Sequence, residues 1–322
     1  MSSTESPEAV LAAVPVPPSG PRAGQGEAVR EVKLPGLTLT VRSRPASGPD
    51  GLAPALFVHG LGGSSTNWSA LMSRLDDRLA CEALDLPGFG YSPPPDDGNY
   101  SFAGHARAVV RLLEAGGRGP VHLFGNSLGG AVATKVAAAR PDLVRTLTLV
   151  SPALPELPPQ RSALPTGLLG VPGIPALLIR ATKDWAPERR TRELLALCYG
   201  EPDRVSDDAF TEHASEYERR VELPYFWDAL SRSARGVLDA YTLGGQHSLW
   251  RQAERVLAPT LLVYGGRDKL VSFRMARRAG RTFRDSRLLA LPNSGHVAMM
   301  EHPDLVARAV RELLDETDGS RK

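Results

Sequence analysis

Ser127 is the residue whose surroundings first suggest chemistry. It lies in the run 125–129 (GNSLG), which fits the pattern G-x-S-x-G, and it follows the apolar run 121–124. We predict that the chain forms a buried strand, turns sharply at Ser127 and begins a helix just after it. Gly125 and Gly129 suit such a turn, because helix and strand backbones approach too closely there for a Cβ atom. The turn would hold the hydroxyl at the edge of a sheet, where a serine can act as a nucleophile.

An acid and a base follow farther along the chain. A serine hydroxyl attacks well only when a base takes its proton and a third group orients that base. Asp268 follows the apolar run 260–264, and His296 follows the apolar run 287–291. Both residues would sit on loops at the carboxyl ends of buried strands, in the chain order serine, acid, histidine. We therefore predict Ser127, Asp268 and His296 as a catalytic triad.

Two other residues compete for these roles. Glu156 follows the apolar run 146–150, but it lies within a proline-rich stretch, so Asp268 is the better placed acid. His302 stands beside a proline at the start of a predicted helix, which favours His296 as the base.

A glycine-rich segment upstream completes the chemistry. The segment 59–63 (HGLGG) follows an apolar run, and glycines in such a turn let backbone N–H groups approach a ligand closely. We predict an oxyanion hole formed by the backbone N–H groups of Leu61 and Leu128, whose side chains are incidental to it. We expect His59 to hydrogen-bond within its own turn rather than to transfer protons, so His59 and Gly60 would serve the structure of the loop.

With these motifs the chain resembles the α/β-hydrolase family from about residue 32 to about residue 314. Two further stretches stand in the family's order, 85–92 (DLPGFGYS) and 301–303 (EHP). The resemblance implies an α/β fold: a mostly parallel eight-stranded sheet, helices on both faces and a helical cap insert. It implies a serine hydrolase but no particular substrate, because this fold hosts many chemistries. Related haloalkane dehalogenases and epoxide hydrolases carry an aspartate where this chain has Ser127.

Strand and helix patterns alternate along the chain, which is typical of a mostly parallel sheet covered by helices. Asn67 is expected to cap the helix after the second strand region. Strands are expected near 31–43, 56–58, 81–85, 121–125, 146–150, 260–264 and 287–291, and helices near 67–75, 101–115, just after Ser127, and 303–314.

Composition divides the chain into a core, an insert and two tails. Residues 1–28 are rich in Pro, Ser, Ala and Gly, and we predict that they and residues 317–322 are disordered. The hydrolase core is expected at 29–151 and 257–316. The insert 152–256 is expected to form a helical cap that acts as a lid, since inserts this long are usually functional. Its helices are expected near 190–199, 207–222 and 226–243.

Two stretches of the insert have open interpretations. The apolar run 167–179 could line a lipophilic pocket or pack the cap onto the body. The charged run 216–220 (EYERR) could be a solvated helix face or a site for a substrate carboxylate.

The composition also limits the kinds of molecule that the protein is expected to bind and the compartment in which it is expected. The 322 residues are 42% hydrophobic and 23% charged, with a net charge of +2, which gives no reason to expect nucleic acid. No stretch reaches the roughly 18 apolar residues of a membrane span. Residues 1–8 carry two glutamates and no basic residue, unlike a secretion signal. Cys81 and Cys198 lie far apart, and we expect free thiols and a cytoplasmic location.

The leading functional prediction is a carboxylic-ester hydrolase that acts on a small or medium apolar acyl ester, with no cofactor and no metal. Asn126 before the serine resembles the hydrolases that cleave carbon–carbon bonds of ring-cleavage products, so that reaction stays open. An acyltransferase or perhydrolase would use the same acyl-enzyme. The non-enzyme alternative is a receptor-like scaffold that binds a small molecule. The oligomeric state is left open.

Overall fold

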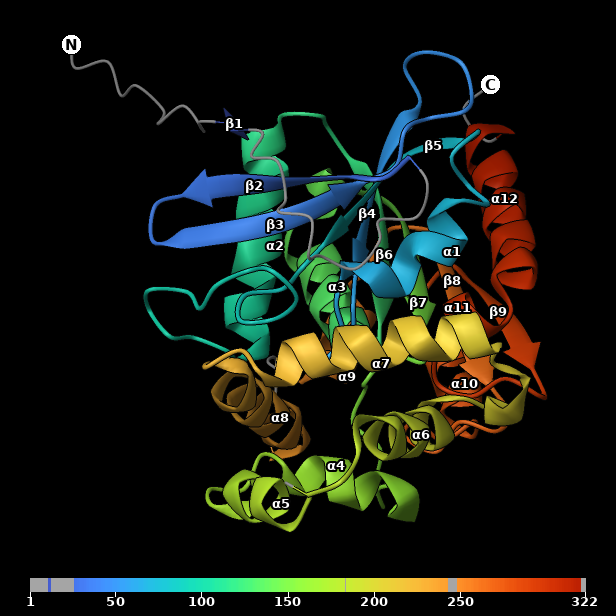
Figure 1. The fold of residues 1–322 in the computed structure, drawn as a ribbon. Coiled ribbons are helices and arrows are strands. Elements are labelled where there is room, and N and C mark those ends of the chain that lie inside the picture. The colour runs from blue at the N-terminus through green and yellow to red at the C-terminus, as the bar shows by residue number, and fades with distance from the viewer. Residues whose placement is uncertain (1–10, 13–25, 183, 243–247, 320–322) are drawn as a thin grey trace.

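The structure, a computed structural model, describes residues 11–12, 26–182, 184–242 and 248–319. One twisted sheet runs through the molecule, with helices on both faces and a further group of helices beyond the ends of its strands (Figure 1). This architecture confirms the predicted α/β fold.

The sheet has the strand order β1-β2-β3-β5-β4-β6-β7-β8-β9. Six neighbouring strands from β5 to β9 are parallel, whereas β2 and β3 form an antiparallel hairpin at one side. The strands are β1 (Leu11–Ala12), β2 (Ala28–Leu34), β3 (Leu37–Ser43), β4 (Ala53–Val58), β5 (Leu79–Leu84), β6 (Val121–Asn126), β7 (Val144–Val150), β8 (Thr260–Gly265) and β9 (Ser286–Leu291).

Two boundaries differ from the sequence-based prediction. The two-residue strand β1 pairs with β2 and lies inside the predicted N-terminal tail, so the sheet gains a ninth strand beyond the eight expected. Ala28, placed in that tail, begins β2. At the other end, helix α12 (Pro303–Gly319) includes the first half of the predicted tail 317–322, although its last buried side chain is that of Leu314. Residues 320–322 lie outside the described part.

The order of the strands fixes where a ligand can bind. The chain passes from β4 to its neighbour β5 and then crosses back to β6 on the other side of β4. In open α/β sheets a crevice forms at the carboxyl ends of the strands where the order reverses in this way. The glycine-rich loop after β4 and Ser127 after β6 both lie at this point.

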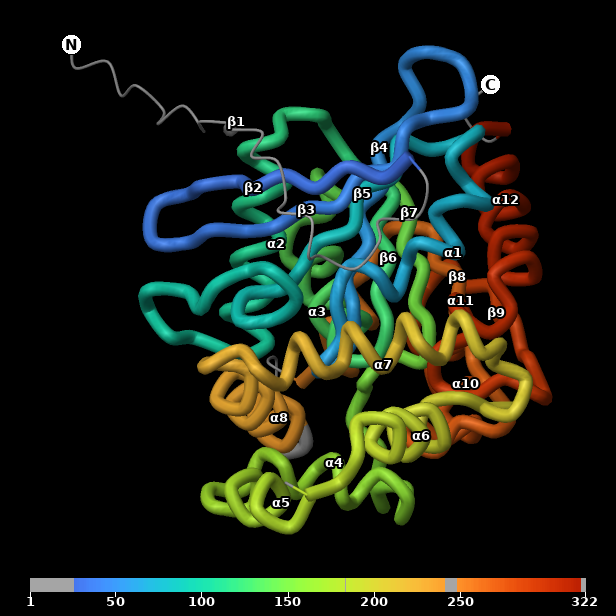
Figure 2. The backbone as a smooth tube through the Cα atoms, in the orientation of Figure 1, coloured from blue at the N-terminus to red at the C-terminus, as the bar shows by residue number. Residues whose placement is uncertain are grey.

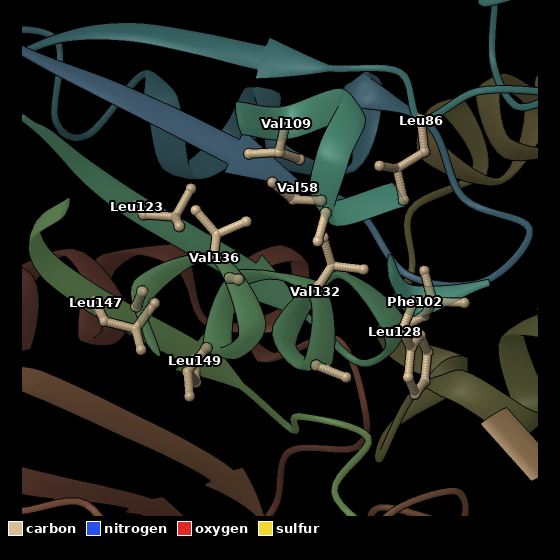
Figure 3. Close-up of a cluster of buried hydrophobic side chains, with 14 of the residues drawn as sticks. Val58, Leu86, Phe102, Val109, Leu123, Leu128, Val132, Val136, Leu147 and Leu149 are labelled. Atoms are coloured by element: carbon tan, nitrogen blue, oxygen red, sulfur yellow. The ribbon is translucent and has the colours of Figure 1, made fainter. Parts of the chain in front are cut away.

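The buried side chains alternate between the two faces of the sheet, as the period of a strand requires. On one face, Val58 and Leu123 pack with Val109 of helix α2 and with Val132 and Val136 of helix α3 (Figure 3). This cluster anchors the helix that begins next to Ser127.

The opposite face carries an aromatic cluster. Phe57 and Phe124 stack with ring centroids 4.1 Å apart, and Trp68 packs against both rings. Helices α1, α11 and α12 cover this cluster. The helices of the body are α1 (Ser69–Met72), α2 (Phe102–Gly116), α3 (Leu128–Ala139), α9 (Leu249–Ala253), α10 (Met275–Thr282), α11 (Ala298–Glu301) and α12 (Pro303–Gly319).

The helix expected near 67–75 is shorter than predicted. A single 3₁₀ turn, Ser65–Trp68, leads into α1, and its cap is Ser64 rather than Asn67. The Asn67 side chain instead accepts a hydrogen bond from the backbone of Ser64, at 3.0 Å. The prediction of Asn67 as the cap was therefore wrong, because the pair forms a capping box in which Asn67 holds the third position.

Among the residues that the structure describes, five α-helices lie between β7 and α9 in the insert. They are grouped beyond the carboxyl ends of the strands, with α7 nearest the sheet and α4 and α5 outermost (Figure 2). Helix α9, which belongs to the expected insert, packs against α3 of the body. The five helices are α4 (Leu164–Leu168), α5 (Ile174–Thr182), α6 (Pro187–Cys198), α7 (Asp207–Val221) and α8 (Phe226–Thr242).

Among the described residues, no helix combines the length and the apolar character that crossing a membrane requires. Both cysteines are free, and Cys81 is buried, as expected.

Candidate active site

Ser127 occupies a sharp turn between β6 and α3. Its backbone angles are φ 52° and ψ −118°, and a positive φ is uncommon for a residue with a side chain. The backbone N–H of Ser127 donates to the carbonyl of Val150 at 3.0 Å, so neighbouring strand β7 holds the turn. The chain thus forms a strand, a turn and a helix here, in the order that the glycine pattern predicts.

The glycines around the turn are required by close contacts. A Cβ atom on Gly125 would lie 2.4 Å from the carbonyl oxygen of Gly129. A Cβ atom on Gly129 would lie 2.3 Å from the carbonyl oxygen of Val58, at the end of β4. On Gly60 it would lie 3.1 Å from the Cβ atom of Ser127. Helix α3, strand β4 and the loop after β4 therefore meet at the serine with no room for side chains between them.

Asp268 and His296 form a buried pair. The Nδ1 atom of His296 lies 2.9 Å from Oδ2 of Asp268. The other carboxylate oxygen accepts hydrogen bonds from the backbone N–H groups of Leu270 and Val271, at 2.7 and 2.9 Å. Burial alone would raise the pKa of Asp268, but the charge and hydrogen bond of His296 and these two N–H groups hold the pKa below its ordinary value. The ionised carboxylate fixes the orientation of the imidazole.

The backbone of His296 is held from two directions. Its N–H donates to the carbonyl of Cys198, the last residue of α6, at 2.7 Å. Its carbonyl accepts a hydrogen bond from the Asn126 side chain at 3.0 Å. The residue before the serine thus links the turn after β6 to the loop after β9. In the sequence, Asn126 indicates only a resemblance to carbon–carbon hydrolases.

Glu301 fixes the rest of the histidine loop. Its carboxylate accepts from the backbone N–H groups of Gly295 and Gly200, both at 2.8 Å, and from the Ser294 hydroxyl at 3.2 Å. The motif 301–303 contained this residue, but its spacing did not reveal which loops it would join.

Ser127 and His296 face the same cavity, which has a volume of about 470 Å³. In the part of the chain that the structure describes, no hydrogen bond joins their side chains. Catalytic hydrogen bonds are often long in an enzyme without substrate and shorten when substrate binds. Most of the wall is apolar and comes from both the body and the insert; it includes Leu154, Leu164, Leu195, Val237, Leu238 and Val271.

Leu61 and Leu128, predicted to form the oxyanion hole, also line this cavity. Leu128 is the first residue of α3, and the first N–H groups of a helix have no acceptor within it. His59 holds the loop that carries Leu61: its Nε2 accepts from the backbone of Leu86 at 3.0 Å, and its Nδ1 lies 2.7 Å from the carbonyl of Gly60. Since Nε2 is an acceptor, the ring is neutral, and burial correspondingly lowers the pKa of His59.

Helix α7 of the insert is tied to the glycine-rich loop after β4 by charged groups. Glu216 accepts from the hydroxyl of Ser64 at 3.1 Å, and Arg220 donates to the carbonyl of Gly62. Arg219 binds both carboxylate oxygens of Glu216, at 2.9 Å each. Glu216 and Arg220 are each only 7% exposed, so the interpretation of 216–220 as a solvated helix face was wrong for these two residues.

Arg220 also contributes to the wall of the cavity. The charges of Arg219 and Arg220 are balanced by Glu216 and by the buried Asp85, whose charge acts on both arginines. Helical spacing places residues 216, 219 and 220 on one face of α7. The sequence shows this spacing, but it does not show that this face of α7 points toward the body.

The competing residues make other contacts, although Glu156 lines the same cavity. Glu156 is buried and pairs with Arg274, whose Nε lies 2.6 Å from its carboxylate, rather than with a histidine. His302 follows α11 and does not line the cavity. Among the described residues, no group of three His, Cys, Asp or Glu side chains is arranged to hold a metal ion.

Comparison with known proteins places this arrangement in a family. The family model for the alpha/beta hydrolase fold matches residues 54–303. The chain belongs to the α/β-hydrolase family. The resemblance seen in the sequence motifs is therefore confirmed, and a hydrolase is the activity that the relatives support.

Three proteins illustrate the range of this α/β-hydrolase's relatives. Monoacylglycerol lipase abhd6-B of Xenopus laevis is 26% identical over 299 residues, which cover 88% of this chain and 81% of the lipase. The structure is similar to that of a candidate lipase (lip1) of Acinetobacter baumannii, with a TM-score of 0.75, 21% identity and coverage of 92% and 93%. It is also similar to a meta-cleavage product hydrolase (CumD) of Pseudomonas fluorescens, with a TM-score of 0.70, 19% identity and coverage of 89% and 97%. At these identities the two structures show a shared fold.

Proposed function

We propose that this protein is a serine hydrolase that cleaves carboxylic esters with a small or medium apolar acyl group. One observation carries the proposal. Nδ1 of the buried His296 lies 2.9 Å from Oδ2 of Asp268, and His296 lines the same cavity as the strained Ser127. The apolar wall and the cavity volume of about 470 Å³ suit an acyl chain of modest size.

The chemistry assigns one role to each group. The Ser127 hydroxyl oxygen attacks the ester carbon while Nε2 of His296 takes its proton. Asp268 keeps the proton on Nδ1 and stabilises the imidazolium that forms. The N–H groups of Leu61 and Leu128 would stabilise the oxyanion. His296 then protonates the leaving alcohol, and water, activated by the same imidazole, releases the acid from Ser127.

We propose that helices α4 to α8 form the lid of this site. They supply much of the cavity wall, and α6 and α7 bond directly to the histidine loop and the oxyanion loop. A lid that excludes water strengthens the electrostatic interactions within. The mechanism uses side chains and backbone groups alone. We propose a cytoplasmic location, which the two free cysteines favour.

The test is turnover of p-nitrophenyl esters from acetate to decanoate by wild type and by Ser127→Ala. We expect the variant to lose roughly 10⁶-fold in kcat. Equal turnover by both proteins would refute the proposal. A fluorophosphonate probe should label wild type and not Ser127→Ala. An unlabelled wild type would instead favour the receptor-like scaffold.

A second candidate is the hydrolysis of carbon–carbon bonds in ring-cleavage products. It is favoured by Arg220, whose positive charge at the cavity wall could receive a substrate carboxylate, and by Asn126 before the serine. Turnover of vinylogous dienoate diketones, lost in Arg220→Met, would support this reaction over ester cleavage. Acyl transfer or perhydrolysis uses the same acyl-enzyme, and added alcohols or hydrogen peroxide would reveal it as a change in product.

A further inference from the structure

The outermost part of the insert exposes an unusual amount of apolar surface. Ten large hydrophobic side chains are exposed among the residues for which burial is described, and six of them lie within residues 157–178. We call these six the apolar cap surface: Leu157 (73% exposed), Leu164 (49%), Leu168 (49%), Val171 (38%), Leu177 (62%) and Leu178 (39%).

Helix α5 shows the feature most clearly. It has the sequence IPALLIRAT, and Pro175 is its only buried residue. A helix that is apolar over most of its surface is normally buried in a core. This one lies at the outer limit of the molecule, beyond α6 and α8 (Figures 1 and 2). The apolar run 167–179 was expected either to line a pocket or to pack the cap onto the body, and most of it does neither.

The apolar cap surface is continuous with the cavity. Leu157 and Leu164 are exposed to solvent and also line the cavity that contains Ser127. Whatever covers this surface therefore lies at the entrance to the candidate active site.

The charge of the segment selects the kind of partner. Between Glu156 and Asp184 the sequence contains three basic residues and no acidic one. Two of the three, Arg161 and Arg180, are exposed, each in or beside a helix that carries the apolar cap surface. Self-association through this surface would bring like charges together. Leucines flanked by arginines are instead typical of segments that lie in the interface of an anionic bilayer.

We propose that the apolar cap surface docks onto anionic lipid bilayers and brings the cavity entrance to the membrane. Leu177 and Leu178 would enter the boundary between headgroups and acyl chains, with Arg161 and Arg180 near the phosphates. An apolar ester could then pass from the bilayer along Leu157 and Leu164 into the cavity. Binding itself does not require that the protein be an esterase, so it can fail or succeed independently of the proposed function.

The experiment is co-sedimentation of the full chain with 100 nm vesicles. One set is phosphatidylcholine alone and the other is an equal mixture of phosphatidylcholine and phosphatidylglycerol. We expect roughly tenfold tighter binding to the anionic set, because each basic residue near such a surface adds severalfold. Added salt at 0.5 M should remove that difference. Ser127→Ala protein should bind equally well, which separates docking from catalysis.

Matched variants make the test specific. Leu177→Asp with Leu178→Asp should abolish binding, yet turnover of a short water-soluble ester should stay unchanged, since neither residue lines the cavity. The control is Leu257→Asp with Leu288→Asp, which changes two leucines that are 59% and 47% exposed outside the insert and should bind as wild type does. Arg161→Gln with Arg180→Gln should weaken binding to the anionic vesicles only.

Three outcomes would overturn the proposal. The first is that wild type remains in the supernatant with both vesicle sets. The second is that the control pair loses binding as fully as the Leu177/Leu178 pair. The third is that sedimentation velocity without lipid shows a dimer that Leu177→Asp with Leu178→Asp converts to a monomer. That last result would assign the surface to a second copy of the chain.

Discussion

The geometry around Ser127 explains why a short sequence pattern carries so much information. A serine at φ 52° is strained, and the strain persists because Gly125 and Gly129 let three backbone segments meet around it. The pattern requires glycine at two positions for steric reasons. A chain with a different fold has no such requirement and would rarely carry both glycines around a serine.

The Asp268 carboxylate should be essential to turnover. We expect Asp268→Asn to lower kcat by about 10⁴-fold, because an amide cannot stabilise the imidazolium and favours the wrong tautomer of His296. The measurement is kcat on the best p-nitrophenyl ester, with circular dichroism to verify the fold. If Glu156→Gln abolished turnover and Asp268→Asn did not, Glu156 rather than Asp268 would be the acid of the triad.

His105 should make folding stability depend on pH. This buried side chain lies 3.0 Å from the Ser233 hydroxyl, and burial lowers its pKa to about 3. It stays neutral in the folded protein but binds a proton below pH 6.5 when unfolded. The contribution of His105 to the free energy of unfolding is therefore complete above pH 6.5 and declines as the pH falls toward 3.

We therefore expect His105→Gln to lose less stability than wild type between pH 7.5 and pH 5.5. The difference should be about 1.4 kcal/mol in the free energy of unfolding, which is one proton over one pH unit. Urea unfolding at the two pH values measures it. Ser233→Ala, which keeps the imidazole, should retain the dependence of wild type; if it behaved as His105→Gln does, the ring would not be the titrating group.

At the scale of elements, the approach of α3 to β4 is the contact that positions Ser127. Gly129→Ala should disrupt it, because the new Cβ atom would lie 2.3 Å from one backbone oxygen and 2.4 Å from another, and backbone cannot yield as a side chain can. We expect loss of turnover together with a fall in the free energy of unfolding of about 3 kcal/mol. Gly280→Ala in α10, where nothing lies within 4 Å, should be neutral or stabilise by about 0.5–1 kcal/mol.

The link between α7 and the glycine-rich loop after β4 is a second contact between elements. Although burial raises the pKa of Glu216, the hydrogen bonds of Arg219 and the charge of Arg220 hold it below its ordinary value, so the carboxylate is ionised. Glu216→Gln would leave the buried Arg220 without its counter-charge. We expect a loss of about 3 kcal/mol in the free energy of unfolding.

The neighbouring glutamate provides the control for that prediction. Glu218 is exposed on the same helix, and Glu218→Gln should change stability by less than about 0.5 kcal/mol. Equal losses in the two variants, measured by urea unfolding, would show that the charge cluster does not secure α7.

The elements also show where sequence reasoning succeeds. The strands that carry Ser127, Asp268 and His296 are apolar runs that end in glycine or polar residues, so both their type and their order could be predicted. The hydrophobic period could not show that Glu216 and Arg220 turn inward, because a helix face with charges 3 and 4 residues apart is normally exposed. Nor could it identify Asn126 and Glu301 as the residues that join distant loops, since those contacts exist only after the sheet has formed.

At the scale of the whole molecule, the body and the insert differ in how they are stabilised. The sheet is buried between two clusters of side chains that alternate along each strand, whereas the outer helices of the insert expose their leucines. Composition and helical periodicity predicted an insert at 152–256. The placement of its outer helices could not be predicted, because these helices have no apolar face that is buried against the body.

This difference should appear in hydrogen exchange. All six residues of β6 are buried, whereas in α5 only Pro175 is, so opening α5 exposes almost no new apolar surface. Amides of α5 should therefore exchange through local opening within seconds to minutes, whereas those of β6 should exchange only through global unfolding, over hours or longer. Mass spectrometry of peptic peptides from residues 174–182 and 121–126 compares the two directly. Equal protection of the two peptides would mean that α5 is packed against the rest of the protein in solution. If α5 binds the membrane, anionic vesicles should slow exchange in α5 and leave exchange in β6 unchanged.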